Sequence, residues 1–145
     1  MERNKVFVDI SVLVAATLSP RGGSFYILFH RKDAYQFQIN EYVFEELLGV
    51  INEKFSSRRS DLLIRLSLIL AVANIQILAN PSKSSLRSLR EVINQEDAPI
   101  LASALRHSDY LLTLDHDFFK KEVKEFVKKR GFIICAPKEF LTEFS

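Results

Sequence analysis

Hydrophobic residues along the chain follow two different spacings, and the two kinds of segment alternate. Short runs rich in β-branched and aromatic residues, without a helical period, are typical of buried strands. They lie at 5–8, 35–39, 75–78, 110–114 and 132–135. Segments with apolar residues three and four positions apart are typical of amphipathic helices. They cover 12–18, 24–31, 41–55, 61–74, 97–107 and 118–129, and a last helical turn is expected at 137–143.

This alternation of strands and helices predicts an α/β fold. Parallel strands need a crossover between them, and a helix is the usual crossover. We therefore expect a three-layer α/β/α sandwich, in which helices cover both faces of a small central parallel sheet. The sequence has no internal repeat and no linker, so residues 1–145 are predicted to form a single domain. The serine-rich segment 81–96 is polar but has apolar residues at helical spacing, and its structure stays open.

Composition narrows the class of protein. Hydrophobic residues make up 48% and charged residues 26% of the chain, as in ordinary globular proteins. The apolar stretches are too short to span a bilayer and the N-terminus lacks a signal-peptide pattern, so we expect a cytoplasmic protein that does not contact a membrane. A single cysteine, Cys135, excludes an internal disulfide. The net charge of +2 does not by itself identify a nucleic-acid binder.

Acidic residues follow two of the predicted strands. Asp9 comes directly after the first strand, and Asp115 and Asp117 follow the strand at 110–114. Asp97 begins the helix that leads into that second strand. Taken singly, Asp97 would complement a helix dipole and Asp117 would cap the next helix. Because open α/β sheets place their ligands at the carboxyl ends of the strands, these side chains together predict a functional site there.

A group of carboxylates at one edge of the sheet needs compensation. Two carboxylates about 6 Å apart repel by roughly 3 kcal/mol at an effective dielectric constant near 20. Mg²⁺ or Mn²⁺ is the cation that suits a site made of carboxylate oxygens. The three histidines are scattered and Cys135 has no partner, so the sequence does not favour zinc. A further acid is available from the helix at 41–55, where spacing alone does not choose between Glu45 and Glu46.

Three stretches of the sequence together resemble the PIN-domain family. They are VFVDISVLVAA at 6–16, VFEELLGVI at 43–51 and EDAPILASALRHSDYLLTLDHDFF at 96–119. The resemblance covers nearly the whole chain and points in particular to the small single-domain bacterial and archaeal group that includes VapC-type toxins. It implies a metal-dependent nuclease, usually acting on RNA, with a small parallel sheet and a cluster of three or four acids.

The resemblance also implies a role for each residue that matches a family motif. The acid of the first strand is Asp9, with Ser11 two residues later, and the helix acid that precedes a leucine is Glu46. The remaining motif positions fall on Asp97, Thr113 and Asp115, with Asp117 as a further acid. The expected catalytic acids are therefore Asp9, Glu46, Asp97 and Asp115. With Asp117, they are the expected ligands of one or two Mg²⁺ or Mn²⁺ ions.

Substrate contacts are expected from hydroxyl groups and from basic side chains. Ser11 and Thr113 would hydrogen-bond a phosphate, orient a metal ligand or simply cap the strand ends. The phosphate backbone would be bound by bases around the cleft: Arg21, Lys32, Arg58, Arg59, Lys83, Arg87 and Arg90. A second basic set is expected to form the solvated face of a helix: Lys120, Lys121, Lys124, Lys128, Lys129 and Arg130.

Other proteins also place an aspartate after the first strand. A phosphatase of the haloacid dehalogenase type needs a second aspartate two residues later, where this chain has Ser11. A response-regulator receiver domain needs a lysine on the last strand, and 132–135 has none. A catalytically silent module that binds nucleic acid or protein remains an alternative, and such a module needs no tight metal site. The expected function is a metal-dependent endoribonuclease that cleaves single-stranded or structured RNA.

Two partners are expected besides RNA. The apolar region at 62–77 has more hydrophobic surface than a small sheet needs to cover, and it predicts a homodimer face. Homodimers are common in the resembled family. The resemblance also implies the toxin of a toxin–antitoxin pair, with an antitoxin protein that masks the acids.

Overall fold

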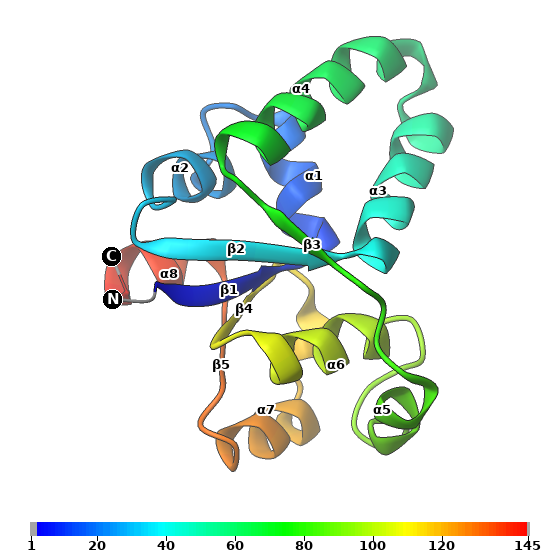
Figure 1. The fold of residues 1–145 in the computed structure, drawn as a ribbon, viewed down its shortest axis with the longest axis vertical. Coiled ribbons are helices and arrows are strands. Elements are labelled where there is room, and N and C mark those ends of the chain that lie inside the picture. Colours follow the sequence, from blue (N-terminus) through cyan, green and yellow to red (C-terminus); the bar gives the residue numbers. More distant parts are fainter. Residues whose placement is uncertain (1–2, 145) are drawn as a thin grey trace.

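The computed structural model describes residues 3–144 and has a parallel sheet at its centre (Figure 1). In these residues the sheet has five strands in the order β3–β2–β1–β4–β5, and every pair of neighbours is parallel. The predicted α/β fold is confirmed. The strands are β1 (Asn4–Val8), β2 (Tyr35–Asn40), β3 (Gln76–Leu78), β4 (Tyr110–Leu112) and β5 (Ile133–Cys135).

Helices cover both faces of the sheet, which confirms the three-layer arrangement (Figure 1). One face carries α1 (Ile10–Leu18), α2 (Gly23–His30), α3 (Glu41–Lys54) and α4 (Arg59–Val72), with the 3₁₀ turn η1 (Ser56–Arg58) between the last two. The other face carries α5 (Lys83–Ser88), α6 (Ala98–His107) and α7 (Lys121–Lys128). The last helix, α8 (Pro137–Glu143), packs against α2. No single helix in residues 3–144 is long and apolar enough to cross a membrane. Together α1 and α2 have the length and composition of a membrane span, but the two helices are bent by 97° at their junction.

The central strand β1 is buried on both faces, as its unbroken apolar sequence predicts. Val6, Phe7 and Val8 are completely inaccessible to solvent. They belong to one hydrophobic core that extends through the sheet into the helices on both sides. Because β1 lies between β2 and β4, the residue that follows it, Asp9, stands at the middle of the carboxyl edge.

The structure differs from the prediction around 113–120. The strand predicted to reach Leu114 ends at Leu112. Thr113 N still donates to the Cys135 carbonyl, but the two N–H groups after it turn to side chains: Leu114 N donates to Ser11 Oγ and Asp115 N to Thr113 Oγ1, both at 3.0 Å. The single helix predicted over 118–129 is divided into a 3₁₀ turn, η2 (His116–Phe119), and α7. Lys120, between them, has an extended backbone. The capping role considered for Asp117 belongs to Asp115.

The segment that the sequence left open, 81–96, contains the short helix α5. Ser82 caps α5, since its hydroxyl accepts a hydrogen bond from Ser85 N at 3.2 Å. The chain then turns into α6, which begins at Ala98 with Pro99 in its first turn. Asp97 is the N-cap residue of α6, but its carboxylate makes no capping bond and is free for other contacts.

Candidate metal centre

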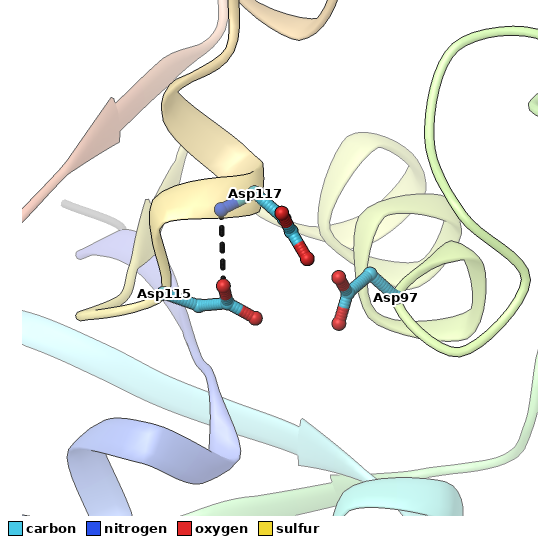
Figure 2. A group of neighbouring side chains, drawn as sticks. All are labelled: Asp97, Asp115 and Asp117. Carbon is cyan, nitrogen blue, oxygen red and sulfur yellow. Dashed lines mark hydrogen bonds between the residues drawn. The ribbon is translucent and has the colours of Figure 1, made fainter.

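Three aspartates converge at the carboxyl edge of the sheet (Figure 2). Asp115 and Asp117 come from the loop and 3₁₀ turn after β4, and Asp97 comes from the start of α6. One carboxylate oxygen from each lies within 4.8 Å of the others, and Figure 2 shows the three side chains directed toward one another. The backbone holds this arrangement, because Asp115 Oδ1 accepts from Asp117 N at 3.0 Å.

Two further polar side chains join the acidic cluster. Asn94 Nδ2 donates to Asp97 Oδ2 at 2.6 Å and to Asp117 Oδ2 at 3.3 Å. Asn94 Oδ1 also accepts a hydrogen bond from Asp97 N at 2.9 Å, so Asn94 holds both the backbone and the carboxylate of Asp97. Lys120 Nζ lies 3.1 Å from Asp117 Oδ1. Lys120 therefore belongs to the cluster, and it is exposed, as are the other bases expected on the solvated helix face.

Asp9 lies deeper than the other acids and is held by two hydroxyl groups. It is only 1% exposed, and its Oδ2 accepts from Ser11 Oγ and from Thr113 Oγ1, both at 2.7 Å. Thr113 is completely buried and also accepts from Asp115 N, so one side chain links Asp9 to Asp115. Ser11 and Thr113 each donate to Asp9 and accept from an N–H that follows β4, so they orient an acid and cap the strand end. Their contact with a phosphate stays a prediction.

Burial and the charges of neighbouring carboxylates raise the pKa of two of the acids, Asp97 and Asp9. The pKa of Asp97 is raised from 3.8 to about 6, first by burial and then by the charges of Asp115, Asp9 and Asp117, against the bond from Asn94. The pKa of Asp9 is also raised, mainly by burial, although the two hydroxyl bonds oppose the shift. The site thus holds carboxylates together at a cost that a bound cation would remove.

Glu46 lies on α3 and is not part of the close group of three aspartates. Its position is seen through Tyr42, one helical turn earlier. Burial raises the pKa of the Tyr42 phenol, and the negative charge of Glu46 raises it further, followed by smaller effects of Glu96, Asp97 and Asp9. Glu46 lies one turn after Tyr42 on the same side of α3, and Tyr42 bonds to the carbonyl of the residue before Asp97. The role of Glu46 as a ligand stays a prediction.

Three hydrogen bonds from Asn40 and Tyr42 link the start of α3, which carries Glu46, to α6 and to the residue before its N-cap, Asp97. Asn40 is completely buried; its Nδ2 donates to Ser103 Oγ at 2.8 Å and to the Pro99 carbonyl at 3.1 Å, while its Oδ1 caps α3. Tyr42 Oη donates to the Glu96 carbonyl at 2.8 Å, next to Asp97. These bonds fix the distance between the two helix starts.

Three of the seven bases expected around the cleft lie in a cavity that meets the acidic cluster at one residue, Asn94. Lys83, Arg87 and Arg90 line a cavity of about 620 Å³ between α5 and the start of α6. Asn94, which contacts two of the aspartates, lines the same cavity. Positive charge therefore adjoins the acidic cluster on this side.

The structure does not bring the other four bases to the acids. Lys32 precedes β2 and lies at the amino edge of the sheet, opposite Asp9. Arg21 follows α1, which starts next to Asp9 and carries the chain about 14 Å away. Arg58 and Arg59 follow the far end of α3, and their side chains bond to neighbours on α3 and α4. Contact of these four bases with a substrate stays a prediction, and the sequence alone did not show at which end of an element each base lies.

Sequence reasoning missed Asn94, Tyr42 and the role of Lys120. Asn94 stands three residues before Asp97, the spacing at which an asparagine oxygen accepts from a following backbone N–H. Lys120 stands three residues after Asp117, and Tyr42 four residues before Glu46. Spacings of three or four residues between polar side chains are common in any sequence. They point to these three residues only once the structure shows that the acids lie together.

The donor set fits a hard divalent cation. All three groups in the close cluster are carboxylates, and no histidine or cysteine of residues 3–144 belongs to it. Oxygen ligands suit Mg²⁺ and Mn²⁺. The raised pKa of Asp97, caused first by burial and then by the neighbouring carboxylates, agrees with a site in which a bound cation would favour the ionised form. The residues that could hold such an ion are Asp97, Asp115 and Asp117, and Thr113 links Asp9 to Asp115 beside them.

Comparison with solved structures identifies the fold. A chain of the VapBC2 complex from Rickettsia felis, bound to a DNA fragment from its promoter, superposes with a TM-score of 0.66 at 19% identity, covering 91% of this chain and 98% of that one. PAE2754 from Pyrobaculum aerophilum superposes with a TM-score of 0.64 at 17% identity, covering 95% and 93%. The chain has a PIN-like fold.

The likeness of the PIN-like chain to known proteins lies in its structure and not in its sequence. No protein-family model matches the sequence, and no curated protein matches it. Both similar structures are aligned over more than nine tenths of their length, so the whole architecture is shared. The family resemblance seen in the acidic motifs therefore agrees with the fold.

Proposed function

We propose that this PIN-like protein is a metal-dependent endoribonuclease that hydrolyses phosphodiester bonds of single-stranded or structured RNA. One observation carries the proposal: Asp9, Asp97, Asp115 and Asp117 come from distant parts of the sequence to one edge of the sheet. Acids that are held together at an electrostatic cost are expected where a cation is used. The likeness to solved PIN-like structures supports the same function.

The chain's own residues have distinct roles in this proposal. Asp97, Asp115 and Asp117 hold the ion, with Asp9 and Glu46 completing the site. When bound, Mg²⁺ or Mn²⁺ activates water and neutralises charge on the phosphodiester. Ser11, Thr113 and Asn94 are positioning residues, since their hydrogen bonds orient the acids. Lys120, exposed and next to Asp117, is available to a phosphate oxygen of the substrate.

We also propose a protein partner. The similar chain from Rickettsia felis is part of a VapBC2 complex. For the present chain, the corresponding proposal is the toxin of a toxin–antitoxin pair, with an antitoxin that covers the acids. A homodimer through the apolar surface of α4 is the second association proposed.

The test is cleavage of labelled single-stranded RNA with Mn²⁺, Mg²⁺ or EDTA. We expect cleavage with either metal and none with EDTA. Asp9→Asn and Asp97→Asn are each expected to lower the rate by about 100-fold or more, because each removes an acid that the ion requires. Asp61→Asn is the matched control: it changes an exposed aspartate on α4 whose ion pairs are with Arg58 and Arg65.

Two outcomes would contradict the proposal. Undiminished cleavage by Asp9→Asn would remove that residue from the site. Absence of cleavage with every metal, together with calorimetry that detects no bound ion, would favour the silent binding module on the same fold.

A further inference from the structure

The segment between β3 and α6 builds a cavity with a distinctive lining. Its volume is about 620 Å³, within the range of about 300–1,000 Å³ typical of small-molecule sites. The basic side chains of Lys83, Arg87 and Arg90 stand on its wall, and Leu86 and Ile93 provide apolar surface. None of the described residues that line it is acidic. The cavity therefore suits a ligand that is anionic at one part and apolar at another.

The two arginines of the cavity are available for a ligand. Within residues 3–144, the guanidinium groups of Arg87 and Arg90 make no hydrogen bond and no ion pair with another residue. Arg58 and Arg65, by contrast, both pair with Asp61. Both cavity arginines are exposed to solvent. Guanidinium groups bind phosphate through paired N–H donors and also stack on nucleobases.

The cavity adjoins the acidic cluster through a shared residue. Asn94 lines the cavity and donates hydrogen bonds to Asp97 and Asp117. A ligand bound against Asn94 therefore lies one side chain away from the candidate metal centre. An acidic peptide offers carboxylates to the arginines, whereas a nucleotide offers both a phosphate for the arginines and the face of a base for the apolar wall of Leu86 and Ile93. A nucleic-acid strand can place one phosphate on the arginines and the next at the metal centre.

We propose that this cavity binds one unpaired nucleotide of the RNA strand, next to the phosphodiester that the acids cleave. Its base packs on Leu86 and Ile93, and its phosphate is bound by Arg87 and Arg90. A paired base is stacked within its duplex and cannot enter, so the cavity selects single-stranded segments. The proposal rests on the proposed nuclease function and adds the basis of its substrate choice.

The experiment measures binding of a fluorescent heptaribonucleotide by anisotropy in EDTA, over a range of salt concentrations. Arg87→Gln combined with Arg90→Gln is expected to weaken binding by about tenfold or more. The slope of log K against log salt concentration should become shallower by about 0.7 for each phosphate that is no longer bound. Lys128→Gln combined with Lys129→Gln removes the same charge from an exposed surface around the end of α7 and is expected to change affinity less than about threefold.

A second series of oligonucleotides tests the base contact. Each has one abasic ribose, placed at a different position. For the wild-type protein we expect one position at which loss of the base weakens binding more than at the others. This difference should disappear in a Leu86→Ser variant. Equal effects at every position would overturn the assignment of a base to the cavity.

The remaining outcomes separate the cavity from the nuclease. Unchanged RNA affinity in the arginine variant would overturn the proposal. The proposal would also be overturned if the arginine variant bound RNA as the wild type does but no longer bound an octaglutamate peptide, because the cavity would then be a protein-binding site. If RNA binding follows the expected pattern but the wild-type protein cleaves no RNA with any metal, the cavity would be supported and the nuclease refuted. Because binding is measured in EDTA, the two results are independent.

Discussion

Asp97 gives the stability of the protein an unusual dependence on pH. Its pKa is about 6 in the folded protein, against an ordinary value of 3.8. Between these two values the folded state holds a proton that the unfolded state has released. Stability therefore falls as the pH rises through this window, which is the opposite of what a salt-bridged aspartate does.

We predict that, without metal, Asp97 lowers the free energy of unfolding by about 1 kcal/mol between pH 4 and pH 7. The shift in pKa corresponds to about 3 kcal/mol, and partial exposure of the carboxylate to water reduces that figure. The measurement is urea unfolding in EDTA across this range, for the wild type and for Asp97→Asn. As the pH rises, the free energy of unfolding of the variant should increase relative to that of the wild type. Parallel profiles would contradict the prediction.

Added Mn²⁺ provides the control for this prediction. A cation bound to the folded state stabilises it by mass action and favours the ionised carboxylate. The wild type should therefore gain stability with Mn²⁺ at pH 7, and Asp97→Asn should gain much less.

At the scale of residues, the acids were predictable from sequence and their supporting residues were not. Asp9 and Asp115 follow strands, and parallel topology puts such residues at one edge wherever the strands pair. Asn94 lies outside any strand or helix, so its contacts depend on how the 81–96 segment folds over α6. Spacing could not choose between Glu45 and Glu46, because the choice depends on which side of α3 faces α6.

At the scale of elements, the site depends on two helices that start at the same edge. Asn40 caps α3 and reaches α6 through Ser103 and the Pro99 carbonyl. An asparagine serves both purposes because its side chain has an acceptor and a donor. Loss of this side chain would leave buried polar groups of α6 without a partner and would loosen the spacing between Glu46 and Asp97.

We predict that Asn40→Ala lowers the free energy of unfolding by about 2 kcal/mol, from the lost cap and the unsatisfied buried groups. Urea unfolding at neutral pH is the measurement. Asn52→Ala, at an exposed position on the same helix, is the control and should cost less than about 0.5 kcal/mol. Equal losses in the two variants would show that Asn40 contributes no more than a surface residue.

Element types were predictable because their signals are local, and the exceptions have local causes too. Apolar runs and helical stripes found β1, β2, α3 and α4 close to their observed bounds. The helix predicted over 118–129 is interrupted because Asp115 caps a 3₁₀ turn before α7 can begin. A side chain that bonds to the backbone two residues later overrides the periodicity of the segment.

At the scale of the whole molecule, α4 carries an apolar surface that the fold does not cover. Ile64, Leu68 and Val72 are 63%, 56% and 40% exposed. They are four residues apart, so they form one stripe along the helix. Leu68 and Val72 also line an apolar cavity with Phe25 and Phe29 of α2. This surface lies within the region that the sequence suggested as a homodimer face, and that association remains a proposal.

We predict that Leu68→Glu shifts the protein toward a monomer, because a leucine side chain buried in an interface stabilises it by about 1.5–3 kcal/mol. Light scattering after size exclusion, over a range of protein concentrations, gives the mass. Ile133→Glu is the control, since it changes an exposed apolar residue on the edge strand β5. A wild-type protein that is monomeric at every concentration would refute the homodimer.

The central place of β1 in the sheet has a consequence for synthesis of the protein. Asp9 accepts one of its hydrogen bonds from Thr113, which is 104 residues further along the chain. Translation at about 5–20 residues per second separates the two by about 5–20 seconds. During that interval a nascent chain exposes the open side of β1 and has none of Asp97, Asp115 and Asp117 in place. The proposed nuclease is therefore inert on the ribosome while most of its chain is made, and its site is assembled in one late step, when β4 joins β1.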